Sequence, residues 1–258
     1  MTQAGVDVIR SAANAQLKEL RRLAQDNSAG RKQGQVWLEG DHLCRAAIDR
    51  GVQPVLAVFA ESFWPLAGAE WAYTAPKTIV LADGLFASVS GLESPARMGF
   101  VVELPRAPTL DPAAATVVLD RLQDAGNVGS ILRSAAAFGF RQVIALKGTA
   151  GLWEPKVVRA GMGAQFALKL FDTAEPALLD VLQVPLVATS SHAGDLLHEA
   201  KLPWPCAWLL GHEGQGVAPD IAARAALSVR IAQPGGEESL NVAAAAAICL
   251  HASAAGRI

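Results

Sequence analysis

The sequence has few cysteines and no long apolar run, and each absence excludes a class of protein. Its cysteines, Cys44, Cys206 and Cys249, are odd in number and form no Cys-x-x-Cys pair. A disulfide framework or a zinc finger is therefore not expected, and we expect reduced thiols in a cytoplasmic protein without a metal site. The most apolar stretch, residues 242–250, is far shorter than the about 20 residues that cross a bilayer, so no membrane partner is expected. The first residues carry Asp7 and Glu19 and no apolar segment, which indicates neither a secretory signal nor a transit peptide.

Charge of either sign is also scarce. Charged residues make up 18% of the 258 positions, and 22 basic against 24 acidic side chains leave a formal charge of -2. This balance argues against a whole-molecule field that attracts nucleic acid, although it leaves room for a local basic surface. The 52% of hydrophobic residues exclude intrinsic disorder and are enough for a core.

The chain divides into two regions with different patterns. Residues 1–103 predict a small α/β unit, with helices at 14–26, 41–49 and 83–89 and strands at 35–39, 54–60 and 98–103. Residues 104–115 contain Pro105, Pro108 and Pro112, which is typical of an extended linker.

Residues 116–258 alternate short apolar strands with helices. This pattern predicts a parallel sheet covered by helices on both faces, in which ligands bind beyond the carboxyl ends of the strands. The expected strands are 116–122, 142–146, 185–190, 207–211 and 227–231, and the expected helices are 128–138, 156–162 and 240–255.

Three motifs follow expected strands. The first is Asn127-x-Gly129-x-x-x-Arg133, where we expect Asn127 to cap a helix and Arg133 to lie in its second turn. The alternative for this stretch alone is a cap with a surface arginine.

The second motif is Gly211-x-Glu213-Gly214-x-Gly216, a glycine-rich turn that exposes main-chain groups to a ligand. Its spacing fits neither a dinucleotide-binding fingerprint nor a phosphate-binding P-loop, and an ordinary tight turn is the alternative.

The third motif runs from Ile231 through Pro234-Gly235-Gly236 to Ser239-Leu240-Asn241. We expect Ser239 or Asn241 to cap the last helix, whose N-terminus offers free N–H donors to an anionic group. Capping alone is again the alternative.

In this order the three motifs resemble the signature motifs of the SpoU (TrmH) family of S-adenosylmethionine-dependent RNA ribose 2′-O-methyltransferases, in the SPOUT superfamily. The resemblance covers residues 116–258, and the Leu38-Glu39-Gly40 strand end resembles the ribosomal-protein-like substrate-binding domain of many relatives. The chain departs from the family pattern at Ala125, where proline is usual, and at Ala232 and Gln233, where Pro-Met is usual.

The resemblance implies a role for particular residues. Arg133 would act on the RNA as the catalytic arginine, with Asn127, Glu213, Ser239 and Asn241 orienting it, the ribose and the loops. The residues implied in S-adenosylmethionine binding are Thr189, Gly211, Gly216, Ile231 and Leu240.

The family also implies a deep trefoil knot, a homodimer packed through the knotted region, and an RNA substrate. The candidate RNA-binding residues around the first helix are Arg21, Arg22, Arg31 and Lys32, with a solvated charged face as the alternative. Ribosomal RNA is the favoured substrate. A transfer RNA 2′-O-methyltransferase and a non-catalytic RNA-binding relative are the alternatives, whereas a Rossmann oxidoreductase and a hydrolase lack their motifs here.

Overall fold

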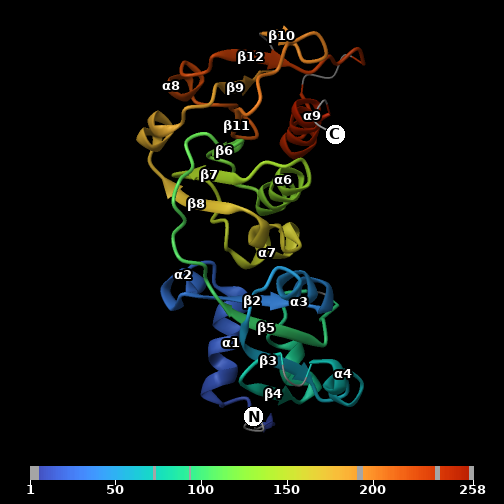
Figure 1. Ribbon diagram of the computed structural model, residues 1–258. Helices are drawn as coiled ribbons and strands as arrows, with labels where there is room; N and C mark the ends of the chain where they lie inside the picture. The colour runs from blue at the N-terminus through green and yellow to red at the C-terminus, as the bar shows by residue number, and fades with distance from the viewer. Residues whose placement is uncertain (1–5, 72–73, 93, 191–193, 236–238, 256–258) are drawn as a thin grey trace. The chain divides into compact units, whose positions relative to one another are not determined.

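The structure is a computed structural model that describes residues 6–71, 74–92, 94–190, 194–235 and 239–255. It forms two compact units, and each is described here by itself (Figure 1). The first contains the chain up to Arg106 together with 153–166, and the second contains 107–152 and the chain from Ala167 onward. Gly236 of the third motif lies outside the described residues.

The first unit is built on a five-stranded sheet in the order β1-β4-β3-β5-β2. Strands β1, β4 and β3 pair in parallel, and β5 runs antiparallel between β3 and β2. The strands are β1 (Val6–Ile9), β2 (Gln35–Glu39), β3 (Pro54–Ala60), β4 (Thr78–Leu81) and β5 (Met98–Glu103). The helices are α1 (Ala15–Gln25), α2 (Ala29–Gln33), α3 (Asp41–Ile48), α4 (Trp64–Trp71), α5 (Asp83–Ala87) and α7 (Pro155–Gly161).

The sequence pattern located most of these elements. Helix α1 buries Leu17, Leu20 and Leu23, as its periodicity indicates, and the Asn14 side chain caps it. Asp41 is a residue type that often caps helices, and the sequence favours it as the cap of α3; this prediction is wrong, because Asp41 is the first helical residue and Gly40 is the N-cap. Strands β1 and β4 were missed because four residues give little periodicity, and α4 contains proline and glycine.

Helix α7 belongs to the core of the first unit although it follows that unit's strands by some fifty residues of sequence. Val158 is 1% exposed there, and Trp153 and Phe166 pack against the same cluster of buried side chains. The core of this unit is therefore completed by a segment from the second region of the sequence.

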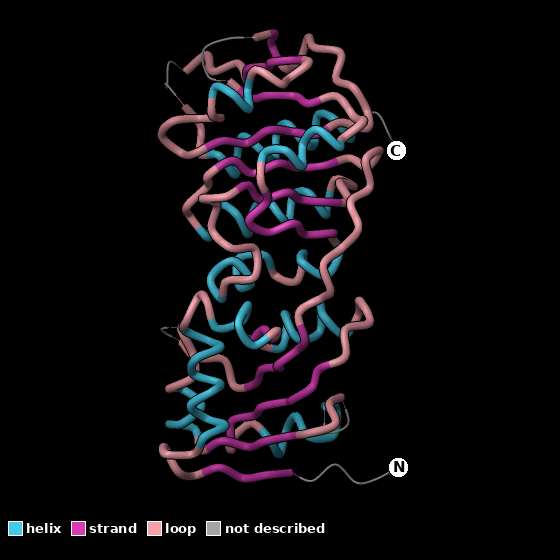
Figure 2. Tube along the Cα trace, turned by 90° about the vertical axis from the view of Figure 1, so that its left-hand side faces the viewer, coloured by secondary structure: helices cyan, strands magenta, loops and turns pink. Residues whose placement is uncertain are grey.

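The strands of the second unit lie side by side in one sheet (Figure 2). This sheet has seven strands in the order β10-β12-β9-β11-β6-β7-β8, and every pairing in it is parallel. The expected parallel α/β architecture is confirmed. The strands are β6 (Thr116–Asp120), β7 (Gln142–Leu146), β8 (Lys169–Ala174), β9 (Leu186–Thr189), β10 (Asp195–Leu196), β11 (Ala207–Gly211) and β12 (Leu227–Arg230). The helices are α6 (Ala125–Ala137), α8 (Pro219–Ala222) and α9 (Val242–Ala254), with a 3-10 turn at Pro176–Val181. A further 3-10 turn, Ala164–Ala167, lies where the chain passes from the first unit to the second.

Strand β6 marks the point where the strand order reverses. From β6 the chain proceeds to β7 and β8 on one side, and the later strands β11, β9 and β12 lie on the other. In a parallel sheet the loops at such a point diverge and leave a crevice at the carboxyl ends of the strands, which favours a site there. Helices α6 and α9 lie side by side against this sheet (Figure 1).

Core polar contacts fix α9 and the segment before β6. The indole N–H of Trp208 in β11 donates to Ser253 Oγ in α9 at 2.9 Å, and both residues are buried. The buried Gln142 amide donates to the carbonyl of Asp111 at 2.9 Å and accepts from its N–H at 3.2 Å. The second half of the proline-rich segment is thereby held on the second unit.

All three cysteines are buried thiols outside any disulfide, and burial raises the pKa of the Cys249 thiol to about 12. None of the described helices has the length and apolar character needed to cross a membrane.

Candidate active site

The first motif begins helix α6, and its cap differs from the sequence expectation. Asp124 is the N-cap, because its carboxylate accepts the N–H of Asn127 at 2.7 Å. The helix thus starts at Ala125, Asn127 lies inside its first turn, and Arg133 lies in the third turn instead of the second. Since Asp124 satisfies the helix end, the Asn127 side chain is available for contacts with other segments.

Asn127 connects the three motifs. Its side-chain N–H donates to Glu213 Oε1 at 3.2 Å, and its side-chain oxygen accepts from the Asn241 amide at 2.9 Å. Asn241 in turn caps α9 by accepting the N–H groups of Ala243 and Ala244, which confirms one of the two expected caps. Residues from the ends of β6 and β11 and from the start of α9 therefore meet in one polar cluster.

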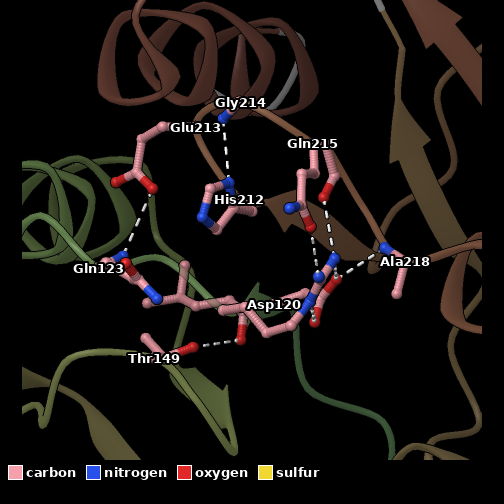
Figure 3. A network of polar contacts seen from close by, with 11 residues as sticks. Asp120, Gln123, Thr149, His212, Glu213, Gly214, Gln215 and Ala218 are labelled. Atoms are coloured by element: carbon pink, nitrogen blue, oxygen red, sulfur yellow. Dashed lines mark hydrogen bonds and ion pairs between the residues drawn. The ribbon is translucent and has the colours of Figure 1, made fainter.

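Glu213 is held by main-chain donors of the first motif. The N–H of Asp124 donates to Oε1 at 3.2 Å. The N–H of Gln123 donates to Oε2 at 3.4 Å (Figure 3). Partial burial by itself raises the pKa of this carboxyl. The hydrogen bonds from its own N–H, from Asn127 and from these two N–H groups outweigh burial and hold the pKa below its ordinary value.

The second motif is a tight loop that closes on itself. A β-bridge pairs His212 with Gly216, and the N–H of Gly214 donates to His212 Nδ1 at 3.0 Å (Figure 3). Gly211 has no space for a side chain, since a Cβ there would lie 2.0 Å from the N of Val217. Gly216 has a φ of +66°, in the left-handed region that favours glycine. The glycines therefore set the shape of the loop.

The remaining expected site residues lie on the same strand-end segments. Arg133 is exposed on α6, and Ser239 and Leu240 are exposed just before α9. Thr189 ends β9 and donates to the carbonyl of Leu209 at 3.3 Å, and Ile231 directly follows β12. Within the described residues, the structure does not join Arg133 or Ser239 to the Asn127 cluster by a hydrogen bond, so it unites three of the five expected catalytic residues.

The expected RNA-binding residues divide into two kinds. Arg22 and Lys32 are exposed. The pKa of Asp26 is lowered mainly by hydrogen bonds from Ser28, and the charges of Lys32 and Arg22 lower it further, which places both near Asp26. Arg31 is exposed on α2. Arg21 instead turns toward Ser88, with Nη2 and Nε at 2.6 and 3.0 Å from its hydroxyl oxygen, so two of its five N–H donors are engaged within the unit.

Sequence reasoning missed Asp120 and Arg121, which lie beside the second motif. Asp120 ends β6 and is 3% exposed, and it accepts the N–H of Ala218 at 2.7 Å (Figure 3). The available signal was a carboxylate directly after the apolar run of a buried strand, because a buried charge needs partners.

A pocket of about 600 Å³ lies on the second unit between the ends of α6 and α9, beside the segments that follow β10 and β12. Its lining is mostly apolar: Phe138, Leu197, His198, Ile231, Ala232, Ala247, Ile248, His251 and Ala252. The residues that the structure describes contain no group of three side chains suited to a metal ion.

Comparison with known proteins agrees with this arrangement. The sequence model of the SpoU rRNA Methylase family matches residues 114–251, which span all three motifs. An uncharacterized tRNA/rRNA methyltransferase of Synechocystis is 34% identical, over 94% of this chain and 92% of the relative. The 23S rRNA (guanosine(2553)-2′-O)-methyltransferase of Bacillus subtilis is 28% identical, over 94% of this chain and 97% of the relative.

A solved structure gives the same fold. A proposed RNA methyltransferase of the TrmH family from Porphyromonas gingivalis aligns with a TM-score of 0.81 at 29% identity, over 95% of this chain and all of that one. The chain belongs to the SpoU rRNA methylase family. The enzyme class that the motifs predict, an RNA ribose 2′-O-methyltransferase, is confirmed at the level of the family.

Proposed function

We propose that this protein transfers a methyl group from S-adenosylmethionine to a ribose 2′-hydroxyl of ribosomal RNA. The observation that carries the proposal is the polar cluster in which Asn127, Glu213 and Asn241 join the three family motifs at the carboxyl edge of the sheet. The names of the relatives favour ribosomal RNA as the substrate class.

The residues of the second and third motifs fit S-adenosylmethionine. The absence of a side chain lets Gly211 lie against the backbone of Gly216 and Val217, and nothing lies within 4 Å of the place where a Cβ of Gly216 would be. Thr189, Ile231 and Leu240 belong to adjoining strand-end segments. We assign these five residues to cofactor binding. When bound, the cofactor supplies an electrophilic methyl group on a positively charged sulfur.

Arg133 is assigned to the RNA. Its guanidinium stays protonated in proteins, so it does not serve as the base. It holds a phosphate beside the target ribose and polarises the 2′-hydroxyl, whose proton passes to a phosphate oxygen or to water. Asn127, Glu213 and Asn241 keep the three loops in register, and Ser239 lies next to them in sequence as a further contact for the ribose.

The two parts of the chain would divide the work. We assign residues 116–258 to methyl transfer and residues 1–103 to RNA binding, joined through 104–115. Arg22, Arg31 and Lys32 are exposed and suited to phosphate contacts, and Arg21 keeps N–H donors for such contacts beside its bonds to Ser88.

A homodimer, a trefoil knot and a cytoplasmic location complete the proposal. The apolar pocket between α6 and α9 supports a dimer, because it lies on the helices that carry the first and third motifs and exposes 42% of Ile248. The knot and the location stay predictions from the family.

The test has two arms. Calorimetric titration with S-adenosylmethionine should show binding, and mass mapping of ribosomal and transfer RNA from cells with and without the gene should show one ribose methylation lost from ribosomal RNA. A loss in transfer RNA alone would favour the transfer RNA enzyme. Absence of cofactor binding would favour a non-catalytic RNA-binding protein.

A further inference from the structure

Two residues outside the three motifs hold the second motif in place. The Asp120 side chain is 5% exposed at the end of β6 and accepts three hydrogen bonds. These come from the N–H of Ala218 at 2.7 Å, from Arg121 Nε at 3.1 Å and from Arg121 Nη2 at 3.2 Å. A buried carboxylate is stable only with such partners, so the pair and the loop depend on each other.

Arg121 reaches further into the same loop. Its Nη1 donates to Gln215 Oε1 at 3.0 Å, and its Nη2 donates to the carbonyl of Gly216 at 3.3 Å. Its backbone has a φ of 56°, an uncommon left-handed conformation for a residue with a side chain. The stem also lies against Gly148, where a Cβ would come within 3.2 Å of Arg121 Cγ. These contacts hold both the left-handed backbone of Arg121 and its guanidinium in a single conformation.

The loop is consequently fastened at two points. Glu213 is bound by main-chain groups of Gln123 and Asp124, and the stretch from Gln215 to Ala218 is bound by the Asp120–Arg121 pair. Gly214 lies between these two points, Gly211 precedes the first, and Gly216 lies within the second stretch. Without the Asp120–Arg121 pair, the part of the loop after Gly214 would keep the His212–Gly216 bridge but lose its hydrogen bonds to Asp120 and Arg121.

We propose that Asp120 and Arg121 are positioning residues for cofactor binding, which preform the loop from Gly211 to Ala218. The inference rests on the proposed function and adds two residues to it. Because they act through the loop and not on the methyl group, their loss should weaken binding of S-adenosylmethionine and leave turnover at saturating cofactor nearly unchanged.

The first test compares Arg121→Gln with Arg141→Gln, an exposed arginine at the opposite end of the neighbouring strand β7 that removes the same charge. Calorimetry should show that Arg121→Gln binds S-adenosylmethionine more weakly, on the order of tenfold, and that Arg141→Gln binds it as the native protein does. A loss of about tenfold lies within the interaction energies measured between residues of one hydrogen-bond network. Amide hydrogen exchange without cofactor should be faster over residues 212–218 and unchanged over β7. Equal affinity and equal loop exchange in the two variants would overturn the inference.

Two more variants separate side chain from backbone. Arg121→Gly relieves the left-handed backbone but removes the guanidinium, so its loop should exchange as fast as that of Arg121→Gln. Arg121→Lys keeps the charge beside Asp120 but lacks the planar fork, so it should restore part of the affinity. A glycine variant with native loop exchange and affinity would show that the guanidinium positions nothing.

A double-mutant cycle tests whether the pair acts as a unit. Asp120→Asn keeps the size of the side chain and an acceptor for Ala218, and it removes the charge that binds Arg121. Adding Arg121→Gln to Asp120→Asn should weaken affinity much less than it does in the native protein, whereas full additivity would contradict the inference. If the native protein itself fails to bind S-adenosylmethionine, the proposed function falls and this inference falls with it.

Discussion

The side-chain amide of Asn241 donates to the side-chain oxygen of Asn127 at 2.9 Å across 114 residues of sequence. The bond joins the first turn of α6 to the cap of α9, and Asn127 passes the connection on to Glu213. The side-chain amide of Asn127 thus makes the geometry of each motif depend on the other two. This dependence explains why the motifs carry more meaning together than singly.

Arg133→Ala should abolish methyl transfer with little effect on cofactor binding. The guanidinium is assigned to the RNA phosphate and the reacting hydroxyl, and removal of one such group costs about a hundredfold or more in turnover. Single-turnover methylation of ribosomal RNA and calorimetry with S-adenosylmethionine measure the two effects. Arg141→Ala is the control, since it removes an exposed arginine from the start of β7. Unchanged turnover in Arg133→Ala would disprove the assignment.

Gly211→Ala should destabilise the second unit by about 1–3 kcal/mol, because the added methyl group overlaps backbone atoms of Gly216 and Val217. Urea denaturation measures this loss, and cofactor affinity should fall with it. Gly214→Ala is the matched control in the same loop, where a Cβ meets only the His212 ring at 3.9 Å. Equal stability of the two variants would mean that the loop at Gly211 is not closed as described.

Glu213 should make stability depend on pH in the acid range. Its pKa in the folded protein lies below the ordinary value of 4.5, so the carboxylate stabilises the fold above that pH. The contribution is lost as the pH falls through the folded pKa. Urea denaturation from pH 7 to about pH 3 should therefore show a steeper fall for the native protein than for Glu213→Gln. Parallel curves for the two proteins would contradict the described hydrogen bonds to Glu213.

Ile248→Lys should convert a dimer into a monomer. The side chain is 42% exposed in the apolar pocket on α9, and a buried lysine at an apolar interface is strongly unfavourable. Sedimentation velocity measures the mass of each form. Leu66→Lys, at a side chain that is 74% exposed on α4 of the first unit, is the control and should leave the mass unchanged. A native protein that sediments as a monomer would refute the dimer.

The sequence alone determined the parallel α/β class of the second unit and the identity of the three motifs, but it did not predict strands β8 and β10. Its apolar strands are short and continuous, and they alternate with helices, so periodicity and turn residues identify them without long-range information. For the same local reason glycines marked the turns after strands, and polar residues narrowed the cap of the last helix to Ser239 or Asn241. Even so, local pattern placed the cap of α6 at Asn127, whereas the structure has Asp124 there, a residue type with a similar preference for the N-cap.

Tertiary structure decided the contacts between distant segments. Helix α7 completes the core of the first unit, and the Asp120–Arg121 pair binds a loop nearly a hundred residues away. Neither relationship leaves a periodic signal, because each depends on which groups are buried together after the chain has folded. A carboxylate at the end of a buried strand indicates that it needs hydrogen-bond partners, and only the folded structure shows which residues these are.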